Sequence, residues 1–497
     1  MQIMYRSTRS ETEVTASKAI LMGLSEDGGL FVPSEIPQLT EPLQELAAMS
    51  YQELAYTVMS KFLTDFTEEE LRACIAGAYD SKFDTPAIAP LKEADGAYYL
   101  ELFHGSTIAF KDMALSILPY LMTTAAKKNG EDKKIVILTA TSGDTGKAAM
   151  AGFQDVPGTE IIVFYPKDGV SDVQEKQMVT QRGANTHVAA IRGNFDDAQS
   201  AVKRMFNDKA LKELLAENGC RFSSANSINI GRLVPQVVYY VYAYAQLLKE
   251  GAVREGEEIN ITVPTGNFGN ILAAYYAKLM GLPVKKLICA SNTNRVLFDF
   301  FETGDYDRKR PFVLTSSPSM DILISSNLER LIYRAAGNAA EKCAAFMRDL
   351  AEKGEYQITA SMRDQLVDFR GGFASEEENF AGIRALYEKT GYVIDTHTGI
   401  GNAVYRRYAE ETGDRTKTVI ASTASPYKFA AAVVRAIDPA RAEGKDEFEL
   451  IDELRAISGT PEPAAITDIR TAPVRHETVA DVEEMPATVL GFLGIRA

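Results

Sequence analysis

The sequence has no tryptophan and is poor in cysteine and histidine, with four of each among 497 residues. Cys74, Cys220, Cys289 and Cys343 are far apart and form no C-x-x-C pair. This spacing argues against a zinc ribbon and favours reduced thiols over disulfides. Four histidines are also too few for a histidine-rich centre. We therefore expect no metal site.

Excess positive charge is absent as well. Lysine and arginine number 53 against 68 aspartate and glutamate residues, which gives a net charge of -15. This balance offers no general basic surface, so we expect no nucleic-acid partner. No apolar run is long enough to span a bilayer, and the start of the chain lacks the apolar core of a signal peptide. We expect a cytoplasmic protein with no membrane partner.

What the chain does have is a regular alternation of strand-like and helix-like segments. At 497 residues it is too long for one simple core, so two or three domains are expected. Segments 51–59 and 68–75 carry apolar residues at helical spacing. From Lys133 onward, short apolar runs alternate with helical stretches, which favours parallel sheets with right-handed crossovers. The expected strands are 135–139, 161–165, 186–191, 259–263, 287–289 and 419–421.

These segments predict an α/β fold with two doubly wound, mainly parallel sheets, preceded by a mainly helical N-terminal domain. In such folds, ligands bind beyond the carboxyl ends of the strands. The expected division is an N-terminal domain 1–92, a large domain 93–129 with 221–460, a small α/β domain 130–220, and a C-terminal extension 461–497.

Lys111 stands in an unusual local setting. The run 97–103 before it reads as a strand, and 113–118 after it reads as the start of a helix. The lysine therefore follows a loop at the mouth of a helix, with apolar neighbours on both sides, and a buried, unpaired ammonium would be costly. A Schiff base with an aldehyde cofactor would remove that cost by using up the amine. The alternative is a solvated lysine that begins a helix.

Two glycine-containing loops follow predicted strands and open predicted helices. In 264–270, small residues let backbone N–H groups approach an anion at a helix N-terminus, which suits a phosphate site. A glycine turn that binds no ligand is the alternative interpretation. The loop 139–147 lies between a predicted strand and a predicted helix, as a Walker A loop does. Thr141 stands at its first glycine position, however, and Ala148 at its Ser or Thr position. An ATPase is therefore disfavoured.

Two further polar segments precede predicted helices. In 226–232, Ser227, Asn229 and Arg232 offer neutral donors and one guanidinium, a set that suits a phosphomonoester. The alternative is an Asn/Ser helix cap with a solvated arginine. In 421–429, hydroxyl side chains follow a predicted strand and cap the next helix. Capping there can coexist with a binding role.

Five of these segments resemble motifs of the threonine synthase family, which are pyridoxal-phosphate (PLP) enzymes of fold type II. They are Asp27–Pro33, His104–Asp112, Thr139–Lys147, Gly266–Asn270 and Ala421–Phe429, and the segment 226–232 resembles a sixth motif less tightly. The first of them is otherwise read as a glycine turn that leads into a short strand. Ser106 departs from the family pattern, where a proline is usual. Ser425 replaces a histidine, whose role is then lost or moved.

The resemblance implies PLP as the cofactor and assigns a role to single residues. Lys111 would bind PLP and act as the general base. Thr423 would contact the PLP ring nitrogen through its hydroxyl, which favours elimination and replacement reactions. The other implied contacts are the PLP phosphate with Gly266, Asn267, Phe268, Gly269 and Asn270, the substrate carboxylate with Ser142, Gly143, Asp144 and Thr145, and the substrate phosphate with Ser227, Asn229 and Arg232.

The reaction implied by the resemblance belongs to amino-acid biosynthesis. A carbon–oxygen lyase, acting as a monomer or homodimer, would convert O-phospho-L-homoserine and water to L-threonine and phosphate by γ-elimination and addition of water at Cβ. Two alternatives remain. A serine or threonine dehydratase-like lyase would need no second anion site, so the cluster in 226–232 discriminates against it. A catalytically inactive PLP-binding homologue is disfavoured by the intact Lys111, Gly266–Asn270 and Thr423.

Overall fold

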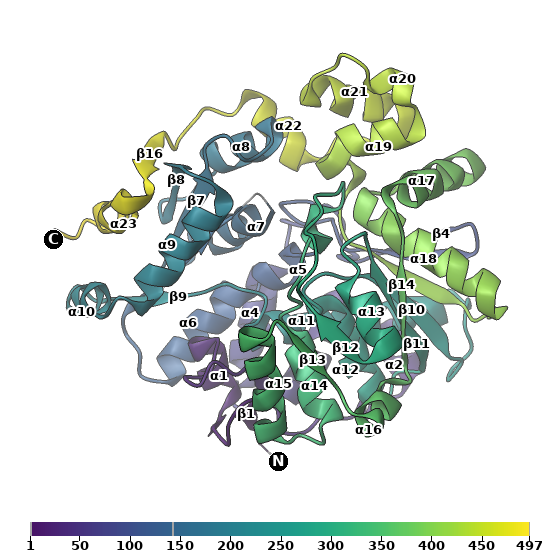
Figure 1. Cartoon of the computed structure of the whole chain (residues 1–497), viewed down its shortest axis with the longest axis horizontal. Coiled ribbons are helices and arrows are strands. Elements are labelled where there is room, and N and C mark those ends of the chain that lie inside the picture. Colours follow the sequence, from purple (N-terminus) through teal and green to yellow (C-terminus); the bar gives the residue numbers. More distant parts are fainter. Residues whose placement is uncertain (1, 142–143, 497) are drawn as a thin grey trace.

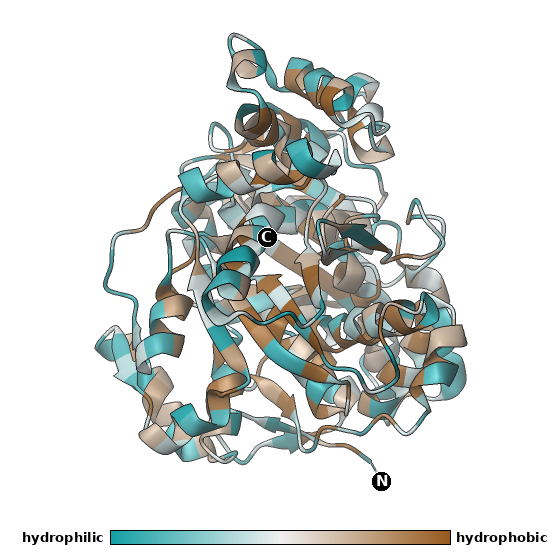
Figure 2. Ribbon diagram, turned by 90° about the vertical axis from the view of Figure 1, so that its right-hand side faces the viewer, coloured by the Kyte–Doolittle hydropathy of each residue, from teal (hydrophilic) through white to brown (hydrophobic). Residues whose placement is uncertain are grey.

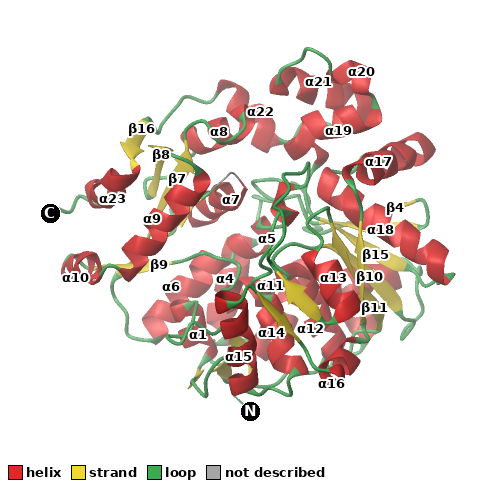
Figure 3. Ribbon diagram, in the orientation of Figure 1, coloured by secondary structure: helices red, strands yellow, loops and turns green. Residues whose placement is uncertain are grey.

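The structure of the chain is a computed structural model that describes residues 2–141 and 144–496. Two parallel sheets lie side by side among helices, and the N-terminal segment packs along one end of them (Figure 1). The strands form separate groups between the helices (Figure 3). Apolar residues are concentrated in the strands and in the inner faces of the helices (Figure 2). The prediction of an α/β fold with two mainly parallel sheets is confirmed.

The large sheet has six strands in the order β14-β11-β10-β15-β5-β4. Neighbouring strands pair parallel except β4, which runs antiparallel to β5. The central strand β10 is buried along its whole length, as a parallel strand covered on both faces should be. The strands are β4 (Leu91–Ala94), β5 (Ala97–Glu101), β10 (Ile259–Pro264), β11 (Val284–Ser291), β14 (Phe369–Phe373) and β15 (Thr418–Ser422).

Helices cover both faces of this sheet. The helix α18 packs on β10, β11 and β15, whereas the long apolar helix α11 packs with α12 and with helices of the N-terminal segment. The helices of this lobe are α5 (Asp112–Leu115), α6 (Leu118–Lys128), α11 (Ile230–Lys249), α12 (Gly269–Leu279), α13 (Val296–Thr303), α14 (Leu328–Ala335), α15 (Ala340–Glu352), α16 (Ala360–Arg363), α17 (Glu376–Thr390) and α18 (Thr396–Thr412), with the 3-10 turns η1 (Pro318–Met320), η2 (Asp364–Leu366) and η3 (Pro426–Phe429) and the pair β12 (Asp305–Asp307) and β13 (Glu355–Gln357).

The small sheet has five parallel strands in the order β16-β8-β7-β6-β9. Alternate residues of β6 face opposite sides: Ile135 and Ile137 join the large core, and Val136 and Leu138 join a second core beneath α9. The strands are β6 (Lys134–Ala140), β7 (Thr159–Pro166), β8 (Thr186–Arg192), β9 (Cys220–Ser223) and β16 (Thr478–Asp481), and the helices are α7 (Asp144–Phe153), α8 (Asp172–Val179), α9 (Phe195–Asn207) and α10 (Lys209–Glu217).

The N-terminal segment mixes strands with helices, so the prediction of a mainly helical domain is wrong in part. A three-stranded antiparallel sheet, β2-β1-β3, accompanies four helices, the first of which lies between β2 and β3 in the chain. Strands of two or three residues are too short to show a period of two in the sequence. The elements are β1 (Tyr5–Ser7), β2 (Glu13–Val14), α1 (Ala16–Met22), β3 (Phe31–Pro33), α2 (Leu43–Ala48), α3 (Tyr51–Phe62) and α4 (Glu68–Ala78).

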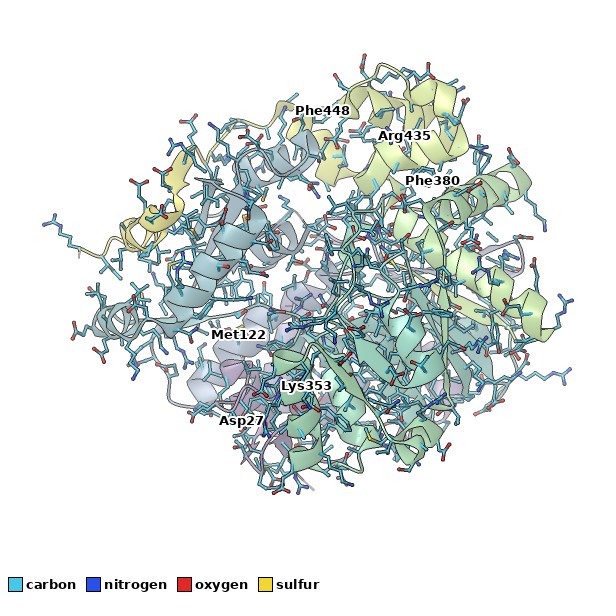
Figure 4. The ribbon with its side chains drawn as sticks, viewed as in Figure 1. Asp27, Met122, Lys353, Phe380, Arg435 and Phe448 are labelled. Carbon is cyan, nitrogen blue, oxygen red and sulfur yellow. The ribbon has the colours of Figure 1, made fainter. Side chains whose placement is uncertain are left out.

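The C-terminal segment connects the two lobes. Phe448 of α21, labelled in Figure 4, has its ring centre 5.4 Å from Lys176 Nζ of α8 and 5.3 Å from Arg470 Cζ. The chain then returns to the small sheet as its edge strand β16. The division into four domains stays a prediction. The elements here are α19 (Ala430–Ile437), α20 (Pro439–Ala442), α21 (Glu447–Ser458), α22 (Ala464–Thr471), η4 (Val482–Glu484) and α23 (Met485–Phe492).

Within residues 2–141 and 144–496, no helix combines the length and the apolar character that a bilayer crossing needs.

Candidate active site

The carboxyl ends of strands from both parallel sheets border one cavity of about 690 Å³. Residues that follow β5, β10 and β15 enter it from the large sheet, and residues at the ends of β6 and β9 enter it from the small sheet. Ser142 and Gly143 lie outside the described residues. The other predicted site residues all line this cavity: Lys111, Asp144, Thr145, Ser227, Asn229, Arg232, Gly266, Asn267, Phe268, Gly269, Asn270 and Thr423.

Backbone pairing fixes the base of the Lys111 side chain. The Phe110 N–H donates to Thr423 O at 2.8 Å, and the Ser425 N–H donates to Ile108 O at 3.0 Å. The residues before the lysine therefore run antiparallel to those that follow β15. Because both segments continue from neighbouring strands of the large sheet, the sheet itself brings Lys111 and Thr423 to the same cavity.

The Lys111 amine is held inside the cavity, with only 13% of the side chain exposed. Its Nζ donates to Ser319 Oγ at 3.1 Å and lies 3.7 Å from Asp144 Oδ2. Burial lowers the pKa of Lys111, and Lys428 and Arg232 lower it further, against the opposing effect of Asp144. The solvated-lysine alternative is wrong. A lowered pKa makes the neutral amine, which is the form that accepts a proton, easier to reach.

Asp144, the first residue of α7, lies between two lysines. Lys428 Nζ is 3.3 Å from Asp144 Oδ1 and donates to Thr107 O at 3.0 Å. Burial on its own would raise the pKa of Asp144, but Lys428 and Lys111 outweigh it and hold that pKa well below its usual range. Together with Arg232, these side chains supply three cations and one carboxylate around the cavity. The local excess of positive charge suits anionic ligands, in contrast to the acidic chain as a whole.

The segment 266–270 turns tightly into α12. Phe268 has a φ of 65°, in the left-handed region that non-glycine residues rarely adopt. Asn270 Oδ1 accepts from the hydroxyls of Tyr239, at 2.9 Å, and Tyr240. The buried Nδ2 of Asn270 has no hydrogen-bond partner among the described residues. An orphaned amide donor beside a helix N-terminus, both at the cavity wall, fits the phosphate of PLP.

Contacts from neighbouring segments hold this loop in place. Asn327 donates from its N–H and from Nδ2 to Asn267 O, both at 3.0 Å. Ser325 Oγ donates to Gly266 O at 2.7 Å. A Cβ at Gly266 would lie 2.5 Å from the backbone oxygen of Ser319, so only glycine lets the two backbones approach this closely.

Arg232 lies in the first turn of α11 and is 3% exposed, so the solvated-arginine alternative is wrong. Its Nη1 donates to Ala225 O at 3.0 Å, while its buried Nε has no hydrogen-bond partner in the part of the chain that the structure describes. Burial lowers the pKa of Arg232 to about 10, which still leaves the guanidinium charged at neutral pH. A buried cation with an unused N–H is costly unless an anion pairs with it.

Asn229 is committed to the protein itself. Its Oδ1 accepts from the Gly231 N–H at 2.9 Å and caps α11, and its Nδ2 donates to Ile20 O at 3.0 Å. The capping interpretation therefore holds for this residue. Ser227 Oγ donates to Asn226 Oδ1 at 3.3 Å in an exposed position. Contacts of Ser227 and Asn229 with a substrate phosphate stay predictions.

Three family descriptions match the chain, and the second and third overlap. Residues 4–79 match the threonine synthase N terminus, residues 84–424 match pyridoxal-phosphate dependent enzymes, and residues 398–487 match the threonine synthase C-terminal region. Threonine synthase of Schizosaccharomyces pombe is 37% identical over 469 residues, which cover 87% of this chain and 89% of that protein. The chain belongs to the threonine synthase family.

Other members of the threonine synthase family agree with this assignment. The structure of PLP-bound threonine synthase from Brucella melitensis has 36% sequence identity and a TM-score of 0.88, and the match covers 100% of both chains. Threonine synthase-like 1 of Macaca fascicularis is 40% identical over 435 residues, 85% of this chain. The match spans only 58% of that longer relative. The predicted PLP dependence is confirmed by the family match over residues 84–424.

Ser425 stands at the position where the threonine synthase motif has a histidine. Ser425 Oγ accepts from the Tyr427 N–H at 3.3 Å and caps η3, so the substituted residue has a structural use. Thr423 is buried at the cavity wall, directly after β15. His397, from α18, also lines the cavity, and its ring packs against Phe429 at a centroid distance of 4.7 Å. The cavity therefore contains a histidine, which comes from α18 and not from the segment 421–429.

No role was assigned from the sequence to Ser319, His397 or Lys428, which all contact the site. Ser319 lies in η1, a three-residue turn with no periodic signal. Lys428 belongs to a segment that resembles a family motif, but no property of that segment assigns it a role. His397 follows Asp395, the N-cap of α18. The sequence signal that could have pointed to His397 was that it is one of only four histidines.

Proposed function

We propose that this chain is a threonine synthase, which converts O-phospho-L-homoserine and water to L-threonine and phosphate. The observation that carries the proposal is a pair of buried donors in the cavity that holds Lys111, neither of which has a hydrogen-bond partner within residues 2–141 and 144–496. Asn270 Nδ2 belongs to the loop that fits the phosphate of PLP, and Arg232 Nε lies on a different helix. A reaction of a phosphorylated amino acid on PLP needs two such phosphate sites, one for each phosphate.

The residues present fit PLP. Lys111 would bind its aldehyde, the backbone of 266–270 with Asn270 would hold its phosphate, and Thr423 would contact its ring nitrogen. When bound, PLP acts as an electron sink for the charge that develops on the substrate carbons. Asp144 and Thr145, with Ser142 and Gly143, are proposed to bind the substrate carboxylate, and Arg232, with Ser227 and Asn229, the substrate phosphate.

The side chains of the cavity then act on the substrate in order. Lys111, with its amine free, takes a proton from Cα and later one from Cβ, which its lowered pKa assists. Arg232 holds the phosphate that departs from Cγ and stabilises the charge that this group gains. Protonation of Cγ, addition of water at Cβ and return of a proton to Cα then give L-threonine.

A dehydratase-like lyase and an inactive homologue are the other candidates. The dehydratase substrates serine and threonine carry no phosphate, so they leave Arg232 Nε without a partner. An inactive homologue that binds PLP would still need Lys111 for the cofactor, but it would have no use for a second phosphate site at Arg232. Two further parts of the proposal are a cytoplasmic location, which free and buried cysteines support, and a monomeric or homodimeric state.

The deciding experiment uses the purified holoenzyme with O-phospho-L-homoserine. We expect phosphate and L-threonine to form in equal amounts. L-serine and L-threonine are tested in parallel, with the corresponding 2-oxo acids as the products to be measured. Rapid release of 2-oxo acids without turnover of the phosphorylated substrate would establish a dehydratase, and no turnover of any of them would support an inactive homologue.

A further inference from the structure

Ser319 places a hydroxyl directly on the amine of Lys111. Its Oγ accepts from Lys111 Nζ at 3.1 Å and donates to Asp144 Oδ2 at 3.3 Å. A hydroxyl has one proton, so a hydroxyl that donates to the carboxylate presents only lone pairs to the amine. One N–H of the lysine is thereby held in a defined direction, between Ser319 and the Asp144 carboxylate at 3.7 Å.

His397 holds the backbone of Ser319 from the opposite side. Its Nε2 accepts from the Ser319 N–H at 3.2 Å, and its Nδ1 lies 2.8 Å from Asp395 Oδ2. Because a backbone N–H only donates and a carboxylate only accepts, these partners select the neutral ring with its proton on Nδ1. Asp395 is fully buried and also caps α18 by accepting from the N–H groups of His397 and Thr398. The ring is therefore fixed in orientation.

The segment that carries Ser319 is anchored at both ends. Ser316 donates from its N–H and its Oγ to Glu376, both at 3.1 Å. Asn292 Nδ2 donates to Asp321 Oδ1 at 2.7 Å. Together with the close approach of its backbone oxygen to the PLP loop, these contacts leave little freedom for Ser319. A group built this rigidly beside a reactive amine is suited to orient it.

We propose that Ser319 is a further catalytic residue that orients the Lys111 amine for proton transfer, and that His397, held by Asp395, is a positioning residue that acts through Ser319. This inference rests on the proposed function, because it assumes that Lys111 is the base. In the transfer, the Cα–H bond breaks, the proton joins the Nζ lone pair, and the electron pair of that bond stays with the substrate. Ser319 Oγ and Asp144 then accept from the ammonium that has formed.

The test compares three serine variants of the holoenzyme. Ser319→Ala removes the contact with the amine, and Ser319→Thr restores a hydroxyl. Ser316→Ala, which keeps the backbone N–H contact with Glu376, is the matched control from the same segment. The first measurement is the exchange of the α-proton of L-threonine in D2O, followed by NMR, because this exchange needs the base but no phosphate release. The second is kcat for O-phospho-L-homoserine. Cofactor retention after dialysis is measured for each variant to show that the fold is kept.

We expect Ser319→Ala to slow both the exchange and kcat by roughly tenfold to a hundredfold, because the loss of one charge-assisted hydrogen bond has an effect of this size. Its KM and its cofactor retention should stay close to those of the parent. Ser319→Thr should regain most of the exchange rate, and Ser316→Ala should keep it. A Ser319→Ala variant that exchanges as fast as the parent overturns the inference. So does an equal loss in Ser316→Ala, because the anchoring of the segment would then be responsible.

The role of His397 is tested through its dependence on Ser319. His397→Phe should slow the exchange in the parent but cause no further loss in the Ser319→Ala background, because a positioning residue has nothing left to position there. His397→Gln, which keeps an acceptor, serves if the phenylalanine variant does not fold. Additive losses would give His397 an independent role and overturn its part of the inference. A parent that exchanges the α-proton but releases no phosphate would refute the proposed function alone.

Discussion

Arg232→Met tests the second anion site at a single side chain. Methionine keeps an unbranched apolar stem as far as the position of Nε but removes every guanidinium donor. In the structure, Nη1 reaches Ala225 O at 3.0 Å, while Nε has no partner among the described residues. Under the proposed function, the substrate phosphate is the partner of Nε that the variant would lose. A charge-assisted hydrogen bond in such a site contributes about 1.5–3 kcal/mol, or roughly one to two decades in kcat/KM.

The assay is steady-state phosphate release from O-phospho-L-homoserine, with L-serine as the unphosphorylated comparison. Because the phosphate is also the leaving group, part of the loss should appear in kcat. The absorbance of the bound cofactor should not change. The thermal midpoint should fall little, since loss of the Ala225 partner is offset by removal of a costly buried charge. Equal losses on both amino acids would make Arg232 a structural residue and refute the reasoning.

Three further predictions concern the cofactor and the stability of the chain. Borohydride reduction followed by peptide mapping should place the cofactor on Lys111, and recovery on the neighbouring Lys428 would contradict the assignment. Gly266→Val should lose PLP on dialysis, because its Cβ would lie 2.5 Å from a backbone oxygen; the control Gly382→Ala, whose nearest contact would be 3.7 Å away, should retain it. Burial disfavours the charged form of His104, but its two carboxylate partners outweigh burial and raise its pKa from 6.5 to about 9. The charged His104 should therefore stabilise the fold fully below about pH 6.5, and this stabilisation should be lost as the pH rises through about 9. The difference in thermal midpoint between the parent and His104→Gln should close over that range. A difference that stays constant would show that the charge of His104 is not its cause.

The sequence by itself determined the elements whose signals are local. The predicted strand 259–263 is β10, and the loop that follows it opens α12 at Gly269. The position of Lys111 between a strand and a helix could also be predicted, and so could the Asn229 cap of α11. Each of these features depends on a window of a few residues, and the spacing of apolar residues and the capping residues within that window can be read from the sequence. Parallel topology then brought the predicted site residues to one cavity, because carboxyl ends of parallel strands share an edge.

Tertiary structure alone decided the contacts between distant segments. Tyr5 pairs with Pro33 in an antiparallel sheet whose pairing the sequence did not predict, and β16 joins the small sheet beside β8, far earlier in the chain. The contact of Ser319 with Lys111 spans 208 residues. A short window of sequence reports whether a residue is buried, but it carries no information on which partner buries it. That choice is made by long-range pairing and packing, and it placed Ser319 and His397 beside the lysine.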